Sequence, residues 1–285
     1  TGKISFEFLR EISSVVKIPI AIAGGLDSEN VVDAINAGAS ILIIGGAVTK
    51  SSDAESAVKT IRRAIDTRTS IKSELFKRFS DDEIKQALSK VSTANISDAM
   101  HRSGWIPSVV PVSPATRFFG KAITVRTFPG DWAKPVEAVD IANEGDVIII
   151  DACGVPPAVW GELATHSAVV KKVAGVVIYG AIRDIKEVKE MNFPAFATMC
   201  IPQAGEPKGL GEINIPIQIG PVKILPGDWI VGDEDGVVCI PGQNAAEIAN
   251  RAMDVLEREN RIRTEIKQGG TLSEVTHLLK WEKQK

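Results

Sequence analysis

The sequence contains little histidine and little cysteine, with three residues of each among 285. Cys153, Cys200 and Cys239 are widely spaced and odd in number, so they show neither a paired-cysteine metal spacing nor a disulfide framework. A lone histidine is more often a structural residue than a metal ligand or a base. The cysteine usage favours reduced thiols in a cytoplasmic protein.

The sequence also lacks an excess of positive charge and any long apolar run. Its formal net charge is -3 and its pI is about 5.8, which disfavours binding to a phosphate backbone. No stretch approaches the roughly 20 apolar residues that span a bilayer, and the N-terminus has no signal-peptide pattern. We therefore expect neither a nucleic-acid partner nor a membrane.

Length and composition predict two domains. At 285 residues and 44% hydrophobic content, a single domain would be unusually large. Residues 66–73 are polar and aperiodic, so they either link two domains or extend the preceding helix. We place the boundary between residues 1–69 and 70–285. Because residue 1 is Thr rather than Met, we expect the chain to be the remainder of a longer protein.

Two consecutive βα units are predicted in the N-terminal part. Residues 18–23 form an apolar run that ends at a glycine pair, as a buried parallel strand would. A helix should follow, beginning at Asp27 or Ser28. The pattern then repeats, with apolar residues 41–44, a second glycine pair and a helix over residues 54–65.

The C-terminal part mixes both kinds of element and is predicted to be α/β. Ser80 and Glu83 have the spacing of a capping box at a helix start. Helical material is expected at residues 158–173, and a long helix at residues 245–267. Strands are expected at residues 122–127, 147–151, 176–179 and 217–219.

The chemistry is predicted at a charged pair that follows a strand. Arg183 and Asp184 come after the strand at residues 176–179, and 20 residues separate Arg183 from Glu162, which lies near a helix start. Open α/β sheets bind ligands where their strands end. For an isolated Arg-Asp dipeptide a solvated surface ion pair is the commoner interpretation, so the context must decide.

An arginine and an aspartate together can bind both a keto acid and a metal ion. A guanidinium is a planar fork of donors that suits a carboxylate, and a carboxylate is a hard oxygen ligand for Mg²⁺ or Mn²⁺. The backbone N–H groups around Leu163 and Ala164, in the first helical turn, would add donors and the positive end of a helix dipole. An enolate forming on a substrate would be stabilised there.

Residues 74–270 resemble the RraA-like family, which includes class II pyruvate aldolases for 4-hydroxy-4-methyl-2-oxoglutarate, oxaloacetate decarboxylases and non-catalytic regulators of ribonuclease activity. The resemblance implies an RraA-like swivelling β/β/α domain. The matching stretches are STANISDA at 92–99, GELAT at 161–165, GVVIYGAIRD at 175–184 and GDEDGV at 232–237.

By resemblance, Arg183 binds the pyruvoyl carboxylate and Asp184 ligates Mg²⁺ (or Mn²⁺). Gly161, Leu163 and Ala164 then contribute substrate contacts. The acidic residue that leads the motif is often Asp in the aldolases and is Glu162 here, as it tends to be in other branches of the family. The founding regulators typically lack the acidic residue after the arginine. This chain retains that acidic residue as Asp184. Its presence favours a lyase over the alternative function, a regulator that binds ribonuclease machinery.

The family also implies a homotrimer or higher assembly in which the C-terminal helix of a neighbouring subunit brings a carboxylate to each site. Glu259 is the first candidate and Glu257 the second, because a charge on an apolar helical stripe needs a partner. The alternative is a solvated residue at the stripe's edge. Asp131, Asp233 and Asp235 are interpreted as turn residues rather than as further acidic ligands.

Two glycine pairs of the N-terminal part follow successive strands, at the position where TIM barrels bind phosphate. They are Gly24 with Gly25 and Gly45 with Gly46. On spacing alone they are ordinary turns. Residues 18–50, however, resemble the last two βα units of hexulose-6-phosphate synthase, which condenses formaldehyde with ribulose 5-phosphate. The resemblance implies a partial TIM barrel that retains sugar-phosphate contacts, with synthase activity only in a complete barrel.

Overall fold

The computed structural model describes residues 6–49, 51, 53–73 and 79–276. The chain forms two compact units, and the division between them falls after residue 78. That is later than the predicted boundary at residues 69 and 70. The Ser70 hydroxyl donates to the Glu29 carbonyl and the Ile71 N–H donates to the Ser28 carbonyl, so residues 70 and 71 of the predicted linker pack with the first unit.

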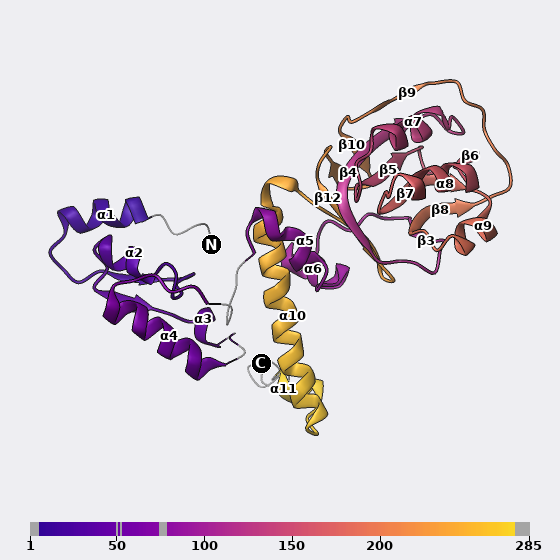
Figure 1. The fold of residues 1–285 in the computed structure, drawn as a ribbon. Coiled ribbons are helices and arrows are strands. Elements are labelled where there is room, and N and C mark those ends of the chain that lie inside the picture. The colour runs from indigo at the N-terminus through magenta and orange to yellow at the C-terminus, as the bar shows by residue number, and fades with distance from the viewer. Residues whose placement is uncertain (1–5, 50, 52, 74–78, 277–285) are drawn as a thin grey trace, which may run out of the picture. The chain divides into compact units, whose positions relative to one another are not determined.

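The N-terminal unit contains one parallel strand pair and its helices (Figure 1). Strand β1 pairs with β2 in parallel, with Ala21 opposite Ile41 and Ala23 opposite Ile43. The elements are α1 (Phe6–Val15), β1 (Ala21–Ala23), α2 (Val31–Asn36), β2 (Ile41–Ile43), α3 (Gly46–Thr49) and α4 (Ala54–Thr67). The two predicted βα units are thus present.

The expectation of buried strands was wrong for this unit. Ile22 and Leu42 pack toward the core, but Ile41 is 51% and Ile43 is 54% exposed. Alternate residues of a strand point to opposite faces, and the described helices cover one face of the pair. Helix α2 also begins later than expected, at Val31, because Asp27 accepts hydrogen bonds from two backbone N–H groups in a preceding turn.

The C-terminal unit is built on a sheet with strand order β13-β12-β4-β5-β7-β8-β3. Neighbours from β4 to β8 are parallel, β6 pairs in parallel with β7, and the remaining pairs are antiparallel. The strands are β3 (Val110–Pro111), β4 (Phe118–Thr127), β5 (Val147–Asp151), β6 (Ala158–Trp160), β7 (Gly175–Ile182), β8 (Ala195–Cys200), β9 (Gly211–Ile213), β10 (Ile217–Ile219), β11 (Val222–Ile224), β12 (Trp229–Asp233) and β13 (Gly236–Ile240).

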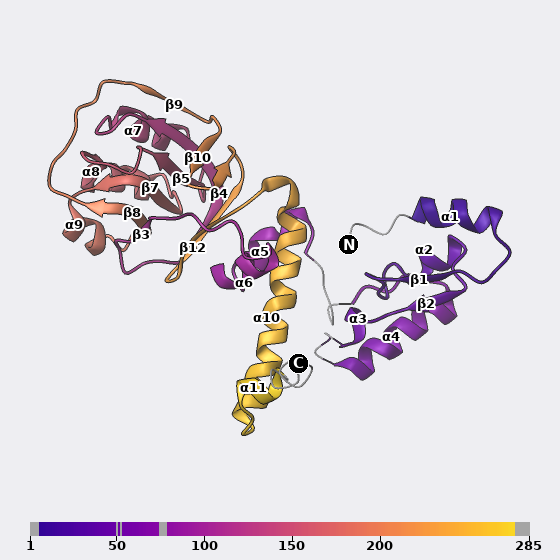
Figure 2. The same cartoon turned by 180° about the vertical axis from the view of Figure 1, so that it is seen from behind.

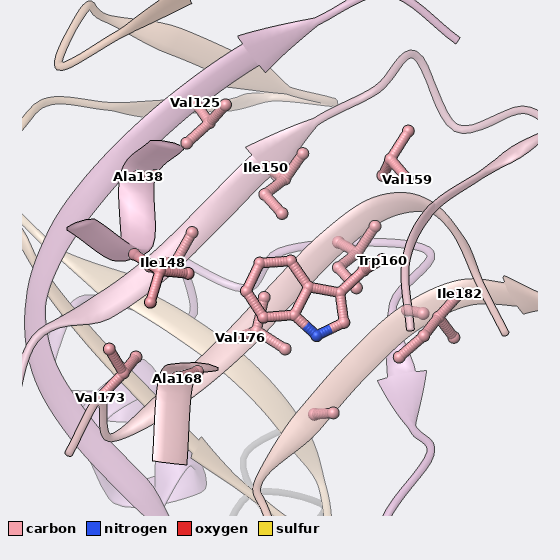
Figure 3. Packing of buried hydrophobic residues seen from close by; sticks show 14 of the residues in the cluster. Val125, Ala138, Ile148, Ile150, Val159, Trp160, Ala168, Val173, Val176 and Ile182 are labelled. Atoms are coloured by element: carbon pink, nitrogen blue, oxygen red, sulfur yellow. The ribbon is translucent and has the colours of Figure 1, made fainter. Parts of the chain in front are cut away.

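Helices cover one face of the parallel strands. Ile148 and Ile150 of β5 pack on that side with α7 (Ala133–Ile141), α8 (Glu162–Val170) and α9 (Ile185–Glu190), and the indole of Trp160 lies in the same cluster (Figure 3). Val147 and Ile149 point to the opposite face, where they meet the β10–β11 hairpin. Burial on both faces explains why β5 reads as a continuous apolar run.

A helical layer packs against β12 and β13. In it, α5 (Ile84–Leu88), α6 (Thr93–Ala99) and the first half of α10 (Ala245–Lys267) share a buried cluster with these strands. The short η1 (Asp81–Glu83) and η2 (Gly242–Asn244) precede α5 and α10, and α11 (Leu272–Val275) contacts α10. The predicted capping box of Ser80 and Glu83 is confirmed, as are the bounds of the long helix, which runs beside α5 and α6 (Figure 2). The apolar face of α10 is buried only as far as Val255, and the helix is progressively more exposed after that residue.

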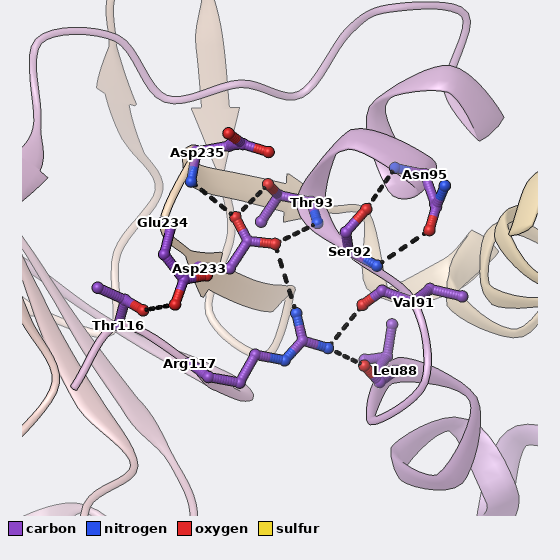
Figure 4. A network of polar contacts seen from close by, with 10 residues as sticks. All are labelled: Leu88, Val91, Ser92, Thr93, Asn95, Thr116, Arg117, Asp233, Glu234 and Asp235. Carbon is purple, nitrogen blue, oxygen red and sulfur yellow. Dashed lines mark hydrogen bonds and ion pairs between the residues drawn. The ribbon is translucent and has the colours of Figure 1, made fainter. Parts of the chain in front are cut away.

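A buried carboxylate ties this helical layer to the sheet. Asp233 accepts hydrogen bonds from the N–H of Thr93 at 2.7 Å, the hydroxyl of Thr93 at 2.6 Å and the N–H of Asp235 at 3.1 Å (Figure 4). Arg117 lies 3.6 Å from the same carboxylate and donates to the carbonyls of Leu88 and Val91. The motifs around residues 92 and 233 therefore serve to anchor α6.

Candidate active site

The segment that begins at Glu162 and the segment with Arg183 and Asp184 meet because β6 and β7 are parallel neighbours. Trp160 pairs with Ile182, so the residues that follow each strand emerge at the same edge of the sheet. The prediction that residues 158–173 are helical was wrong at its start. Ala158–Trp160 is a buried strand, and the helix begins only after Gly161.

A short set of hydrogen bonds fixes this junction. The indole N–H of Trp160 donates to the Thr165 hydroxyl at 2.9 Å, and that hydroxyl donates to the Gly161 carbonyl at 2.9 Å. The Arg183 N–H donates to the Trp160 carbonyl at 3.1 Å. Trp160 and Thr165 are buried, so the start of α8 is held rigidly against the end of β7.

Asp184 is the point of contact between the two segments. Its Oδ2 accepts a hydrogen bond from the Glu162 N–H at 3.1 Å and lies 3.4 Å from Nε of Arg183. Its backbone is in the left-handed region, at φ +57°, which is uncommon outside glycine. A Cβ on Gly161 would lie 2.5 Å from Asp184 Oδ2, so only glycine leaves room for this approach.

A cavity of about 220 Å³ opens at this junction. Arg183 and Asp184 line it, with side chains 42% and 34% exposed, together with Gly161, Leu163 and Ala164 at the start of α8. The first N–H groups of a helix have no intrahelical acceptor and carry the positive end of its dipole. The predicted substrate-binding residues are therefore brought together in one concave, partly solvated site.

An aromatic wall that the sequence analysis missed completes the cavity. Trp132 lines it, and its indole N–H donates to the Gly205 carbonyl at 3.2 Å. A Cβ on Gly205 would lie 1.8 Å from the Gly130 carbonyl oxygen, so the loops carrying Gly130 and Gly205 pack backbone to backbone. The available signal was the Pro-Gly-Asp-Trp run at 129–132, which by itself predicts only a turn.

Asp131 holds this wall in place. Its buried carboxylate accepts hydrogen bonds from the backbone N–H groups of Ala133, Lys208, Gly209 and Leu210. Burial disfavours its charged form, but these donors more than offset that effect, so the pKa of Asp131 is lowered below its usual value. This carboxylate therefore organises two loops around the cavity.

Other predicted residues lie elsewhere. Glu162 contributes its backbone N–H, while its carboxylate lies 3.6 Å from Nε2 of His166, one helical turn away. Glu259 is on α10, where it accepts a hydrogen bond from the Asn95 side chain at 3.0 Å, and it does not line the cavity of its own chain. Glu257, the second candidate, is on the same helix.

The glycines of the N-terminal unit occupy the expected loops. Gly24 and Gly25 follow β1 with φ of +95° and +66°, and Gly45 and Gly46 follow β2. Because β1 and β2 are parallel, both loops lie at the same edge of the pair. Among the described residues, no group of three or more His, Cys, Asp or Glu side chains is arranged to hold a metal, and no helix has the length and apolar character to cross a membrane.

Comparison with known proteins identifies the family. The family model for RraA-like proteins, described as Aldolase/RraA, matches residues 93–239, just over half of the chain. The chain belongs to the RraA-like family. The expected α/β fold with an RraA-like domain is thereby confirmed, whereas the partial TIM barrel and the synthase resemblance stay predictions.

Three similar proteins illustrate the range of this family. An uncharacterised protein of Methanocaldococcus jannaschii is 39% identical over 162 residues, which cover 56% of this chain and 78% of that protein. A Thermus thermophilus protein named 4-hydroxy-4-methyl-2-oxoglutarate aldolase is 30% identical over 151 residues, 52% of this chain and 92% of that protein. The crystal structure of Streptomyces coelicolor RraAS2, described as an unusual member of the RNase ES inhibitor RraA family, matches with a TM-score of 0.59 and 26% identity. The match covers 66% of this chain and all of that one.

Proposed function

We propose that the C-terminal unit is a divalent-metal-dependent carbon-carbon lyase, an aldolase or decarboxylase, that acts on a small 2-oxo acid. The observation that carries the proposal is that Arg183, Asp184 and the first turn of α8 line the same cavity. The aldolase name of the Thermus thermophilus relative supports the same reaction class.

The residues present fit Mg²⁺ or Mn²⁺. Asp184 presents a partly solvated carboxylate at the cavity, with one oxygen already oriented by the Glu162 N–H. Mg²⁺ typically binds through one or two carboxylates and keeps several waters, so it needs no cluster of acidic side chains. We infer that Asp184 holds the metal, which when bound would act as a Lewis acid on the keto oxygen.

The chain's own residues would bind the substrate and stabilise the charge that develops on it. Arg183 pairs with the carboxylate of the 2-oxo acid through its planar fork. When the bond between C3 and C4 breaks, or when CO₂ leaves, its electron pair moves onto the keto oxygen as an enolate. The N–H groups of Leu163 and Ala164 would stabilise that oxygen. In the aldol case the C4 hydroxyl gives its proton to solvent as C4 becomes a carbonyl carbon, and in both cases C3 takes up a proton from solvent.

We also propose the family's assembly for this chain, a homotrimer or higher, in which Glu259 of one copy approaches the cavity of the next. Its position on the exposed half of α10 supports this role, since it is not enclosed by its own chain. Light scattering on the purified protein tests the assembly. Glu259→Gln should lower turnover without changing the oligomeric mass.

The decisive experiment measures pyruvate release with lactate dehydrogenase as the coupling enzyme. The substrates are oxaloacetate and 4-hydroxy-4-methyl-2-oxoglutarate, each with and without Mg²⁺. We expect metal-dependent release from at least one of them. No release from either, combined with inhibition of a purified ribonuclease, would instead support the regulator that the RraAS2 description suggests.

For the N-terminal unit we propose a hexulose-6-phosphate-synthase-like origin with a phosphate site at its four loop glycines. The support is the parallel β1–β2 pair, whose exposed Ile41 and Ile43 form the kind of apolar surface that a larger barrel would cover. Titration with ribulose 5-phosphate tests it. Binding that survives Gly24→Ala combined with Gly45→Ala would contradict the site.

A further inference from the structure

A chain of hydrogen bonds runs from the apolar core to the carboxylate of Asp184. The indole N–H of Trp160 donates to the Thr165 hydroxyl, and that hydroxyl donates to the Gly161 carbonyl, each at 2.9 Å. The peptide that carries this carbonyl continues to Glu162, whose N–H donates to Asp184 Oδ2 at 3.1 Å. Thr165 therefore connects a buried ring to the proposed metal ligand through a single peptide plane.

The chemistry of the groups fixes the direction of each bond in this chain. An indole N–H only donates and a peptide carbonyl only accepts, whereas a hydroxyl does both. The Thr165 oxygen therefore accepts from Trp160, and its one hydrogen is directed to the Gly161 carbonyl. Hydrogen bonds in a chain polarise and strengthen one another, and the last donor of this chain is the N–H that Asp184 accepts.

The start of α8 depends on this connection for its orientation. Its N-cap residue is Gly161, which has no side chain that could cap the helix. The Gly161 carbonyl accepts the Thr165 N–H at 3.1 Å, as in any helical turn, and the Thr165 hydroxyl adds a second donor. Two donors from one residue restrict the tilt of a peptide more than one donor does.

The connection is also internal to one chain. The Trp160 indole lies among apolar side chains of the core and is 3% exposed, and Thr165 is 0% exposed (Figure 3). Side chains buried to this degree are out of reach of a neighbouring copy. The orientation that they impose is therefore the same in a single chain and in an assembly.

We propose, resting on the function proposed above, that Thr165 is a positioning residue for the metal and for the enolate oxygen. Its hydroxyl fixes the peptide between Gly161 and Glu162. That peptide orients Asp184 and sets the direction of the N–H groups that follow it in α8. Thr165 itself does not line the cavity, so it acts through these groups and not by touching a ligand.

The side chain that would bind the substrate carboxylate is held by a different bond. The Arg183 N–H donates to the Trp160 backbone carbonyl at 3.1 Å, and this bond does not pass through Thr165. Loss of the Thr165 hydroxyl should therefore change metal affinity and kcat and leave KM for the 2-oxo acid nearly unchanged. A residue that only stabilises the fold would change the unfolding midpoint and leave these constants of the folded protein as they are.

The test measures Mn²⁺ affinity by isothermal titration on the full chain, which requires no turnover. Thr165→Val keeps the shape of the side chain and removes the hydroxyl, so it should weaken Mn²⁺ binding about tenfold or more and lower kcat similarly. At saturating Mn²⁺, KM should stay within about twofold of the wild-type value. Thr165→Ser restores the hydroxyl and should return the affinity to within about twofold of wild type.

Two further variants complete the test. Trp160→Phe decides the question if valine at position 165 prevents folding. It removes the indole donor and keeps the Thr165 hydroxyl, so Mn²⁺ affinity should fall about threefold, and wild-type affinity in this variant would overturn the proposal. Thr60→Val is the matched control, because the Thr60 hydroxyl makes the same kind of bond, 2.8 Å to the Ser56 carbonyl, on α4 of the other unit. It should change neither Mn²⁺ affinity nor kcat.

The outcomes separate this proposal from the proposed function. If the wild type releases pyruvate, and Thr165→Val binds Mn²⁺ and turns over as the wild type does, the positioning role is overturned and the lyase stands. If no tested 2-oxo acid is cleaved, but Thr165→Val loses Mn²⁺ affinity and Thr165→Ser keeps it, the lyase fails and the positioning role stands. Equal losses in the two variants, or a wild type that binds no Mn²⁺, overturn the positioning role.

Discussion

The carboxylate of Asp184 accepts a hydrogen bond from the backbone N–H of Glu162, the first residue of α8. The two residues are 22 positions apart in the chain, and the contact exists because their strands, β6 and β7, lie side by side in parallel. It joins the proposed metal ligand to the helix start that would stabilise an enolate.

Asp184→Ala should abolish metal-dependent release of pyruvate, because it removes the carboxylate proposed to hold the cation. The loss should exceed about 100-fold in kcat. Isothermal titration with Mn²⁺ provides a readout besides activity and should show no binding. Unchanged turnover in this variant would reject the metal assignment.

Arg183→Lys should act mainly on binding of the keto acid. A lysine keeps the charge but loses the bidentate fork, so KM should rise about tenfold or more while kcat falls much less. Steady-state kinetics separates the two parameters. A fall in kcat at constant KM would show that the guanidinium acts on the transition state and not on the bound substrate.

Gly161→Ala should impair the site through crowding. The backbone there is extended, so alanine can adopt it, but its Cβ would lie 2.5 Å from Asp184 Oδ2 and 3.1 Å from Arg183 Cγ. We expect kcat/KM to fall at least about tenfold, since a displaced carboxylate cannot keep its position. The thermal unfolding midpoint is measured in parallel, and normal activity in this variant would contradict the geometry of the junction.

Asp131→Asn should destabilise the C-terminal unit in a pH-dependent way. The pKa of Asp131 is lowered in the folded protein, so its charge contributes stability that is fully present above the ordinary carboxyl pKa of about 3.9. That contribution disappears as the pH falls through the lowered pKa of the folded state. At pH 7 we expect a loss of about 1–3 kcal/mol in unfolding free energy, measured with urea.

The difference between wild type and Asp131→Asn should shrink below about pH 4. Asp140→Asn is the matched control, because Asp140 is an exposed carboxyl on α7, the helix that follows Asp131, and should change stability by less than about 0.5 kcal/mol. A difference between wild type and Asp131→Asn that is independent of pH would mean that shape and not charge holds the two loops.

Thr93→Val should destabilise the attachment of α6 without affecting the site. Its hydroxyl donates at 2.6 Å to the buried Asp233, and valine of similar shape leaves that oxygen one donor short. We expect a loss of about 2 kcal/mol in unfolding free energy with unchanged turnover. Thr116→Val, which removes a 2.7 Å bond to the exposed Glu234, should cost less than about 1 kcal/mol.

The sequence by itself determined the elements whose local signals agree with their surroundings. The long helix at Ala245–Lys267, the capping box of Ser80 and Glu83 and the strand at Val147–Asp151 were predictable because periodicity, caps and burial indicate the same state. The prediction that Arg183 and Asp184 share a site with the start of a helix rested on their position after a strand and on the resemblance to the RraA-like family, and the described cavity brings these residues together.

Only the tertiary structure decided how the two charged segments meet and what surrounds them. Ala158–Trp160 reads as part of a helix until its pairing with β7 is known, because short apolar runs suit either state. Trp132 becomes a wall of the cavity through a hydrogen bond to a loop 73 residues away. Asp131 supports that wall because backbone N–H groups of the same loop donate to its carboxylate. Contacts between segments so distant in the chain leave no local periodicity, so the shape of the cavity could not be predicted from the sequence.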